Sequence, residues 1–338
     1  MSESAWTTEQ LAGQRLMVGF DGIEFGNQLE FLITKLRVAG IILFSRNVGT
    51  PEEIAALCAA AQDCARACGQ PPLLVAVDQE GGQVARLRSP FFTEFAGNPA
   101  MDGQADAEAF ARITAAELLA VGLNMNLAPV MDLAPAQMDS IMAGRAFGAD
   151  PQRVAELGTT VIEGLQHRGI MAVAKHFPGI GRTTLDSHLD LPVLDADPRL
   201  LKATDLCPFA AAIQAGVAGI MLSHVRYTGL DPIWPASLSP VIARDLLREK
   251  MGYDGVIMTD DLDMGAIAPH YDIDTSIGQV LEADVDLALI CHWGPAIETA
   301  FDALVKKLQS DDLLRNRGRA SVKRVMDLKR RYLDGLPA

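Results

Sequence analysis

The stretch GVIMTDDLDMGAI, residues 255–267, decides the fold because it joins a buried strand to a group of acids at its end. Its first half, GVIMTD, is mostly apolar, which is typical of a strand covered on both faces of a parallel sheet. That strand would end at Asp260, and Asp261 and Asp263 follow at once. The same pattern, an apolar run that ends in a polar residue, recurs in both directions along the chain.

Eight such runs predict a closed barrel. Besides 255–260 they cover residues 15–20, 40–44, 73–78, 123–129, 171–176, 219–224 and 287–292. Helical patterns at 51–68, 106–121, 151–168, 240–250 and 295–308 lie between or after them. Strands alternating with helices eight times indicate an α/β chain folded as a single (β/α)8 TIM-like barrel. A charged helix near 311–333 is expected to pack outside it, and because no Gly/Ser linker interrupts the chain, residues 1–338 are predicted to form one domain.

Composition excludes several classes of partner. The chain has 338 residues, of which 49% are hydrophobic, and a formal charge of −14, so it has no long-range attraction for nucleic acid or an anionic membrane. No apolar run approaches the ~18 residues of a membrane span. The N-terminal MSESAWTTEQLAGQRLM lacks the basic head and apolar run of a secretory signal, and the five cysteines are expected to be reduced. A cytoplasmic monomer is the resulting expectation.

Ionisable residues gather at the predicted strand ends, where the active sites of such barrels form. A chain must surface there, so a single polar residue means little, but the set predicts a site. Its members are Asp78, Lys175, His176, His224, Asp260 and His292.

The loop KHFPGIGRTTLDSHLDLP, residues 175–192, carries a candidate proton shuttle. In an extended segment Asp186 and His188 project to the same side. A carboxylate that binds one imidazole nitrogen leaves the other nitrogen to move a proton. The alternative is an Asp–His pair that only tethers the loop.

Further side chains suit a substrate rich in hydroxyl groups. Asp260 could act as a nucleophile, or the acids beside it could cap the next helix. Asp78 in DQEGG offers an acceptor, and Arg86, Arg145 and Lys175 offer donors. The first strand ends in VGFDG without the histidines of barrel metallohydrolases, so neither a metal nor another cofactor is expected.

Taken together, DQEGGQVARLR, GRAFG, KHFPG with DSHLDLP, LSHVRYTGLDPIWPASLSP and GVIMTDDLDMGAI resemble family 3 glycoside hydrolases, over residues 10 to 305. The resemblance is to bacterial β-N-acetylglucosaminidases of the NagZ type. It implies a double displacement in which Asp260 attacks the anomeric carbon and His188, partnered by Asp186, donates the proton. It also implies sugar binding by Asp78, Arg86, Arg145, Lys175 and His176, and terminal β-linked GlcNAc on muropeptides as substrate.

The loop departs from the family pattern at two positions. Relatives carry a histidine and an aspartate where this chain has Ile180 and Arg182. Arg182 could attract an anionic aglycone, or it could tether the loop to a carboxylate. A β-N-acetylglucosaminide phosphorylase and a non-catalytic sugar-binding barrel are the alternative functions. A broad β-glucosidase is disfavoured, because those relatives usually take their acid from a second domain.

Overall fold

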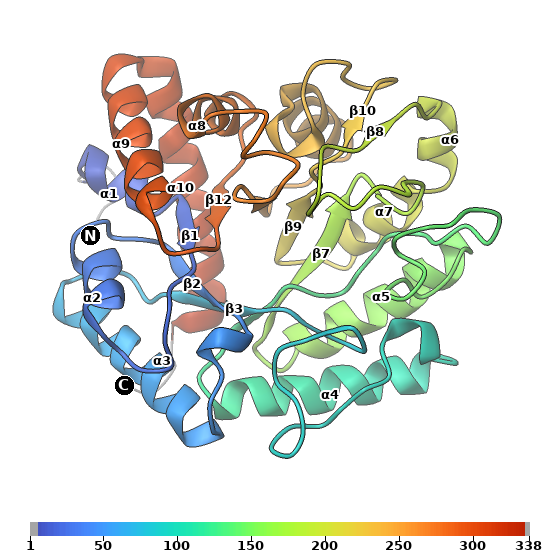
Figure 1. Ribbon diagram of the computed structural model, residues 1–338, viewed down its shortest axis with the longest axis horizontal. Helices are drawn as coiled ribbons and strands as arrows, with labels where there is room; N and C mark the ends of the chain where they lie inside the picture. Colours follow the sequence, from blue (N-terminus) through green and yellow to red (C-terminus); the bar gives the residue numbers. More distant parts are fainter. Residues whose placement is uncertain (1–5, 335–338) are drawn as a thin grey trace.

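The predicted eight-stranded barrel is confirmed. The structure is a computed structural model that describes residues 6–334; residues 1–5, part of the stretch lacking a signal pattern, and 335–338, the end of the predicted domain, lie outside the described residues. Eight parallel strands close in the order β1-β12-β11-β9-β7-β6-β3-β2 (Figure 1). They are β1 (Leu16–Val18), β2 (Gly40–Leu43), β3 (Leu74–Val77), β6 (Met125–Asn126), β7 (Met171–Phe177), β9 (Gly219–Leu222), β11 (Val256–Asp261) and β12 (Leu287–Ile290).

Helices follow the strands and form the outer layer. Their starts are set locally: Thr50 closes a capping box on one helix and Asp150 caps another, each followed by proline. The helices are α1 (Thr8–Gly13), α2 (Asn27–Thr34), α3 (Pro51–Ala67), α4 (Gln104–Ala120), α5 (Pro151–Gln166), α6 (Pro198–Ala203), α7 (Leu206–Gln214), α8 (Ile273–Glu282), α9 (Pro295–Ser310) and α10 (Asp312–Leu333). Between β9 and β11 the helix η5 (Val241–Lys250) is a π-helix.

Small elements decorate the loops at the carboxyl ends of the strands. DQEGG and the residues that follow it fold into a hairpin of β4 (Gln79–Gly81) and β5 (Val84–Ala85). β8 (Val193–Leu194) pairs in parallel with β10 (Arg226–Tyr227). Single turns of 3₁₀-helix lie at η2 (Ser45–Asn47), η3 (Asn98–Ala100) and η4 (Ala236–Leu238). These loops, rather than the strands, shape the rim of the barrel.

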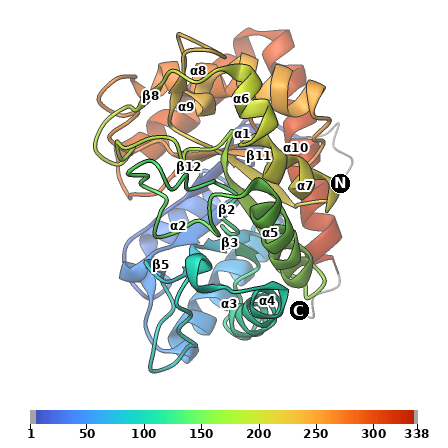
Figure 2. The ribbon, with the colours of Figure 1, turned by 90° about the vertical axis from the view of Figure 1, so that its right-hand side faces the viewer.

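The last helix closes the opposite end of the barrel. Val325, Leu328 and Leu333 of α10 belong to the same apolar cluster as interior strand residues such as Met17 and Leu74. Figure 2 shows α10 at one end of the barrel and the loops with β5 and β8 at the other. The predicted helix is therefore present, but it seals the amino-terminal end of the barrel instead of only covering its side. Among residues 6–334, no helix is both long and apolar enough to cross a membrane.

Candidate active site

A cavity of about 410 Å³ opens at the carboxyl ends of the strands. Seven of the eight predicted site residues line it, and the eighth, Asp186, reaches it through its bond to His188. The ends of β7 and β11 and the residue just after β3 lie here, as expected for a parallel barrel. The predicted lining residues are Asp78, Arg86, Arg145, Lys175, His176, His188 and Asp260.

Asp78 lies just after β3 between two cations. Its Oδ1 accepts from Lys175 Nζ at 2.7 Å and its Oδ2 from Arg86 Nη2 at 3.0 Å. Burial alone would raise the pKa of Asp78, but the charges and hydrogen bonds of Lys175 and Arg86 hold it far below its usual range. The side chain is therefore a carboxylate fixed in place at the cavity wall.

Glu80 is a second buried carboxylate, and the sequence analysis did not single it out. Its Oε1 lies 2.7 Å from both Lys175 Nζ and Arg145 Nη2, and its Oε2 accepts from Arg145 Nε at 3.0 Å. The fork of Arg145 thus binds Glu80 with two hydrogen bonds. Burial would lower the pKa of Lys175, but Asp78 and Glu80 raise it above its ordinary value, so Lys175 stays charged.

His176 is oriented by Asp132, which the sequence analysis also missed. Asp132 is fully buried, and its Oδ2 lies 2.7 Å from His176 Nδ1 and accepts the His176 backbone N–H at 3.2 Å. A carboxylate can only accept, so the ring proton sits on Nδ1 and Nε2 is left for a ligand. Asp132 Oδ1 accepts the N–H of Ile180, which also fixes the start of the following loop.

Asp260, the penultimate residue of β11, lies in the cavity wall and is held ionised. Burial would raise its pKa, but the imidazoles of His224 and His176, the backbone N–H of Asp261 at 2.8 Å and Lys175 bring it below the ordinary value. His224 itself is buried: its Nε2 donates to the carbonyl of Asp261 at 2.8 Å, and its Nδ1 lies 2.7 Å from Ser237 Oγ. An ionised carboxylate in a cleft is what nucleophilic attack on a sugar requires.

His188 and Asp186 form the predicted dyad on the outer side of the cavity. His188 Nδ1 lies 2.7 Å from Asp186 Oδ1, which also accepts the His188 backbone N–H at 2.9 Å. Burial would raise the pKa of Asp186, but these two hydrogen bonds bring it below its ordinary value. The His188 side chain is 65% exposed, so its Nε2 is accessible to a substrate and to solvent.

The structure decides between the two readings of Arg182. Its Nε donates to Asp205 Oδ2 at 2.8 Å and its Nη2 to Thr204 Oγ1 at 3.0 Å. Arg182 is therefore a tether for the loop and not a docking point for an anionic aglycone. Gly181 is required nearby, because a Cβ there would overlap the carbonyl oxygen of Leu133. Ile180 is buried.

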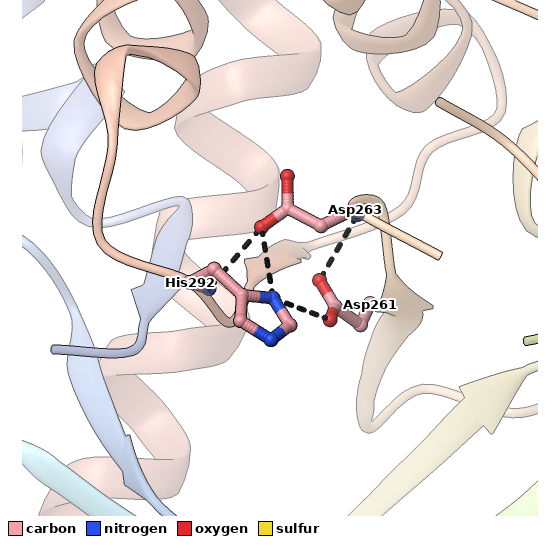
Figure 3. A group of neighbouring side chains, drawn as sticks. All are labelled: Asp261, Asp263 and His292. Carbon is pink, nitrogen blue, oxygen red and sulfur yellow. Dashed lines mark hydrogen bonds and ion pairs between the residues drawn. The ribbon is translucent and has the colours of Figure 1, made fainter. Parts of the chain in front are cut away.

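Among residues 6–334, Asp261, Asp263 and His292 form a group whose ligand atoms lie within 4.8 Å of one another, close enough to hold a metal ion (Figure 3). His292 Nδ1 lies 3.7 Å from Asp261 Oδ2 and 3.6 Å from Asp263 Oδ2. The carboxylates already bind backbone: Asp261 Oδ1 accepts from the N–H groups of Asp263 and Cys291, and Asp263 accepts from that of His292. Burial is the main cause that raises the pKa of Asp261 to about 6. These contacts tie the loop after β11 to the end of β12, and the absence of a metal stays a prediction.

Comparison with known proteins identifies the family. Residues 7–328 match the family described as "Glycosyl hydrolase family 3 N terminal domain". The chain belongs to glycoside hydrolase family 3. It is a glycosidase, as its sequence predicted.

The relatives agree with this assignment. The "Beta-hexosaminidase" of Alkalilimnicola ehrlichii is 36% identical over 294 residues, which cover 83% of this chain and 82% of that protein. A family 3 β-N-acetylglucosaminidase from Paenibacillus sp. has a TM-score of 0.92 at 37% identity; the match covers 99% of this chain and 64% of that one. The β-N-acetylhexosaminidase of Beutenbergia cavernae has a TM-score of 0.88 at 32% identity, over 96% and 98% of the two chains.

Proposed function

We propose that this family 3 chain is a retaining exo-β-N-acetylglucosaminidase that removes terminal β-linked GlcNAc by double displacement. The observation that carries the proposal is the cavity itself. Asp260 and His188 both line it, together with the carboxylate of Asp78 and the cations of Arg86, Arg145 and Lys175. Such a mixture of charged donors and acceptors suits a hydroxyl-rich ring. The choice of GlcNAc as the sugar rests on the names of the relatives, which are β-hexosaminidases and β-N-acetylglucosaminidases.

Asp260 is the proposed nucleophile. Its carboxylate would attack the anomeric carbon, forming a glycosyl ester as the bond to the leaving oxygen breaks. Water would then cleave that ester with a second inversion, so the β configuration is retained. The groups that hold the pKa of Asp260 down, among them the Asp261 backbone N–H and the Lys175 ammonium, are already in place before substrate arrives. Asp261, the acid next to it, is the weaker candidate. Its pKa is raised to about 6, and its Oδ1 already accepts hydrogen bonds from the backbone N–H groups of Asp263 and Cys291.

His188 is the proposed acid and base. Its Nε2 would protonate the leaving oxygen in the first step and take a proton from water in the second, while Asp186 holds the ring through Nδ1. Asp78 just after β3 and Lys175 and His176 of β7, together with Arg86 and Arg145, would hold the sugar.

The finer parts of the proposal rest on the resemblance of the motifs. We propose that the chain acts as one catalytic domain and as a monomer in the cytoplasm, on GlcNAc-containing muropeptides released during peptidoglycan recycling. No cofactor enters the reaction as written. The chain's acidity fits a substrate held by local cations rather than by its overall field.

Trapping the covalent intermediate tests the nucleophile. A 5-fluoro glycosyl fluoride with the GlcNAc configuration should label Asp260, as read by peptide mapping. Asp260→Asn should lower turnover by several orders of magnitude while the chain stays folded, because a neutral amide cannot form the ester. Asp254→Asn, at an exposed acid two residues before the same strand, is the matched control and should keep full activity. Label on Asp261 would move the nucleophile.

Paired substrates test the sugar and the acceptor. Aryl β-GlcNAc should be cleaved at least on the order of a hundredfold more efficiently than aryl β-glucoside, a difference of about 3 kcal/mol in transition-state binding. Comparable efficiencies would leave only a general family 3 glycosidase. Release of GlcNAc 1-phosphate when phosphate is added would establish a phosphorylase instead, since phosphate would then replace water in the second step.

A further inference from the structure

The segment that carries the proposed acid is exposed from Asp186 to Leu189 except at Ser187, whose side chain is buried. The side chains of His188 and Asp186 are 65% and 49% exposed, and Leu189 is 76% exposed. An acid must sit within hydrogen-bond reach of the leaving oxygen, so something other than burial has to fix this segment.

The loop that follows the strand of Asp260 makes three contacts with the exposed segment. The backbone N–H of Ala266 donates to the carbonyl of Ser187 at 3.0 Å. His270 Nε2 lies 2.7 Å from Asp190 Oδ1. Gly265 lies directly against the backbone of His188 and Leu189, so that a Cβ on Gly265 would stand 2.5 Å from the His188 carbonyl oxygen.

This loop is itself firmly held by the barrel. Ala266 and Ile267 are buried, and the Tyr271 ring packs on Trp234 at 5.3 Å between centroids. The N–H of Met264 donates to the carbonyl of Asp261 at 3.1 Å, which turns the chain directly after the strand. A short piece of chain, buried at Leu262, Met264 and Ala266, thus connects the proposed nucleophile to the backbone of the proposed acid.

We propose that residues 264–270 form a clamp that sets the position of His188 relative to Asp260. Its positioning residues are Gly265 and His270, and Asp190 is the partner of His270 in the clamped segment. The inference rests on the proposed function in that His188 is taken as the acid. Glycine is required at 265 because close backbone approach leaves no room for a side chain. Met264 and Gly265 also line the cavity, but the clamp supplies no reacting group and would act on catalysis through the position of the imidazole.

Gly265→Ala tests the clamp through its leaving-group dependence. The methyl group must push the His188 backbone away, and a displacement of about 1 Å can cost on the order of a hundredfold in rate. We expect kcat/KM to fall by about tenfold or more on GlcNAc disaccharides, whose leaving group needs a proton, and by less than about twofold on dinitrophenyl β-GlcNAc. Gly26→Ala, where a Cβ meets nothing within 4 Å, should change neither.

A second variant covers the case in which Gly265→Ala does not fold. His270 and Asp190 are exposed, so His270→Ala should fold, and it should show the same split between substrates to a smaller degree. In a double-mutant cycle, His270→Ala should add nothing to the split already caused by His188→Ala, since the two act through one imidazole.

The outcomes separate the two proposals. If His188→Ala shows the split and both clamp variants lower the two substrates equally, the clamp is only structural and the inference is overturned. If His188→Ala itself shows no split, the assignment of the acid fails, and the clamp falls with it.

Discussion

At the residue scale, His188 is exposed while its ring is fixed through a 2.7 Å contact at Nδ1, whereas His292, also exposed at the cavity, has its Nδ1 3.6 Å or more from the nearest carboxylates. Exposure suits a group that must exchange protons with solvent between the two steps of a double displacement. His176 and His224 have the opposite environment, because both are buried and bonded. Burial lowers the pKa of His224, which suits a fixed neutral ring rather than a proton shuttle.

His188→Ala should therefore slow poor leaving groups far more than activated ones. General acid catalysis contributes on the order of 10²–10⁴ in rate, and most of this should be lost on disaccharides but little on dinitrophenyl glycosides. Asp186→Ala should act in the same direction more weakly, because the imidazole remains and only its orientation and basicity change. Steady-state kinetics on both substrates give the comparison. Equal losses on the two substrates would leave His188 a loop-tethering residue.

Glu80→Gln should destabilise the fold as well as the site. The substitution leaves Lys175 and Arg145 buried around a neutral amide, and breaking a buried ion pair costs about 3–5 kcal/mol. Glu282→Gln is the control, because Glu282 pairs with Arg317 at the surface, where such pairs contribute about 0–1 kcal/mol. Urea unfolding would measure both free energies. Similar losses in the two variants would contradict the central role of Glu80.

The residues that the sequence revealed and those that it hid differ in their surroundings. The predicted site residues lie in loops and strand ends with a recognisable motif, and all converge on the cavity. Glu80 lies inside the DQEGG motif, but nothing near it in the sequence indicates its role. Its two partners, Arg145 and Lys175, are 65 and 95 positions away along the chain. Asp132 lies in the chain after β6, outside any of the quoted motifs, and its role becomes clear only from its contact with His176 in the structure.

At the scale of elements, Asp132 joins the connection after β6 to the end of β7. One carboxylate there serves the ring and N–H of His176 and the N–H of Ile180. The sequence pattern located both strands because apolar runs are local, and it also located the helix that proves to be η5. It could not foresee the hairpin in DQEGG or the clamp on the His188 segment, since both depend on chain that packs from elsewhere.

Asp132→Asn should disorder this junction. The amide offers one acceptor oxygen, so an N–H group of His176 or Ile180 loses its partner, and a buried unsatisfied group costs about 1–3 kcal/mol. We expect a loss of that size in unfolding free energy and a rise in KM, because the His176 ring loses its fixed orientation. Asp311→Asn is the control: Asp311 caps α10 at the surface by accepting from two backbone N–H groups, and asparagine caps equally well. An unchanged KM in Asp132→Asn would show that His176 does not hold the sugar.

At the scale of the whole molecule, the site and the terminal helix occupy opposite ends of one barrel (Figure 2). The sequence placed α10 outside because its charged residues suggest a solvated surface. Two of those charges are instead paired under the barrel: Arg324 binds the fully buried Asp286, which also binds Arg248, and Lys329 Nζ donates to Gln14 Oε1 at 2.8 Å. A helix can be charged and still seal a core when its charges find partners at the rim of the contact.

Lys329 should give the folded chain a pH dependence of its own. Burial lowers the pKa of Lys329 to about 7, whereas a lysine in an unfolded chain titrates near 10.4. Between these values the unfolded chain binds a proton that the folded chain does not, so stability rises with pH. The gain from this lysine should be about 2 kcal/mol between pH 7 and pH 9, at about 1.4 kcal/mol per unit of pH once the folded form is neutral.

Lys329→Met, which fills a similar volume without a charge, should remove this rise. Urea unfolding at the two pH values would measure it, with Lys306→Met on the exposed side of α9 as the control that leaves the rise intact. If the difference in unfolding free energy between wild type and Lys329→Met is the same at both pH values, then Lys329 keeps its proton in the fold, and the end of the barrel under α10 admits water.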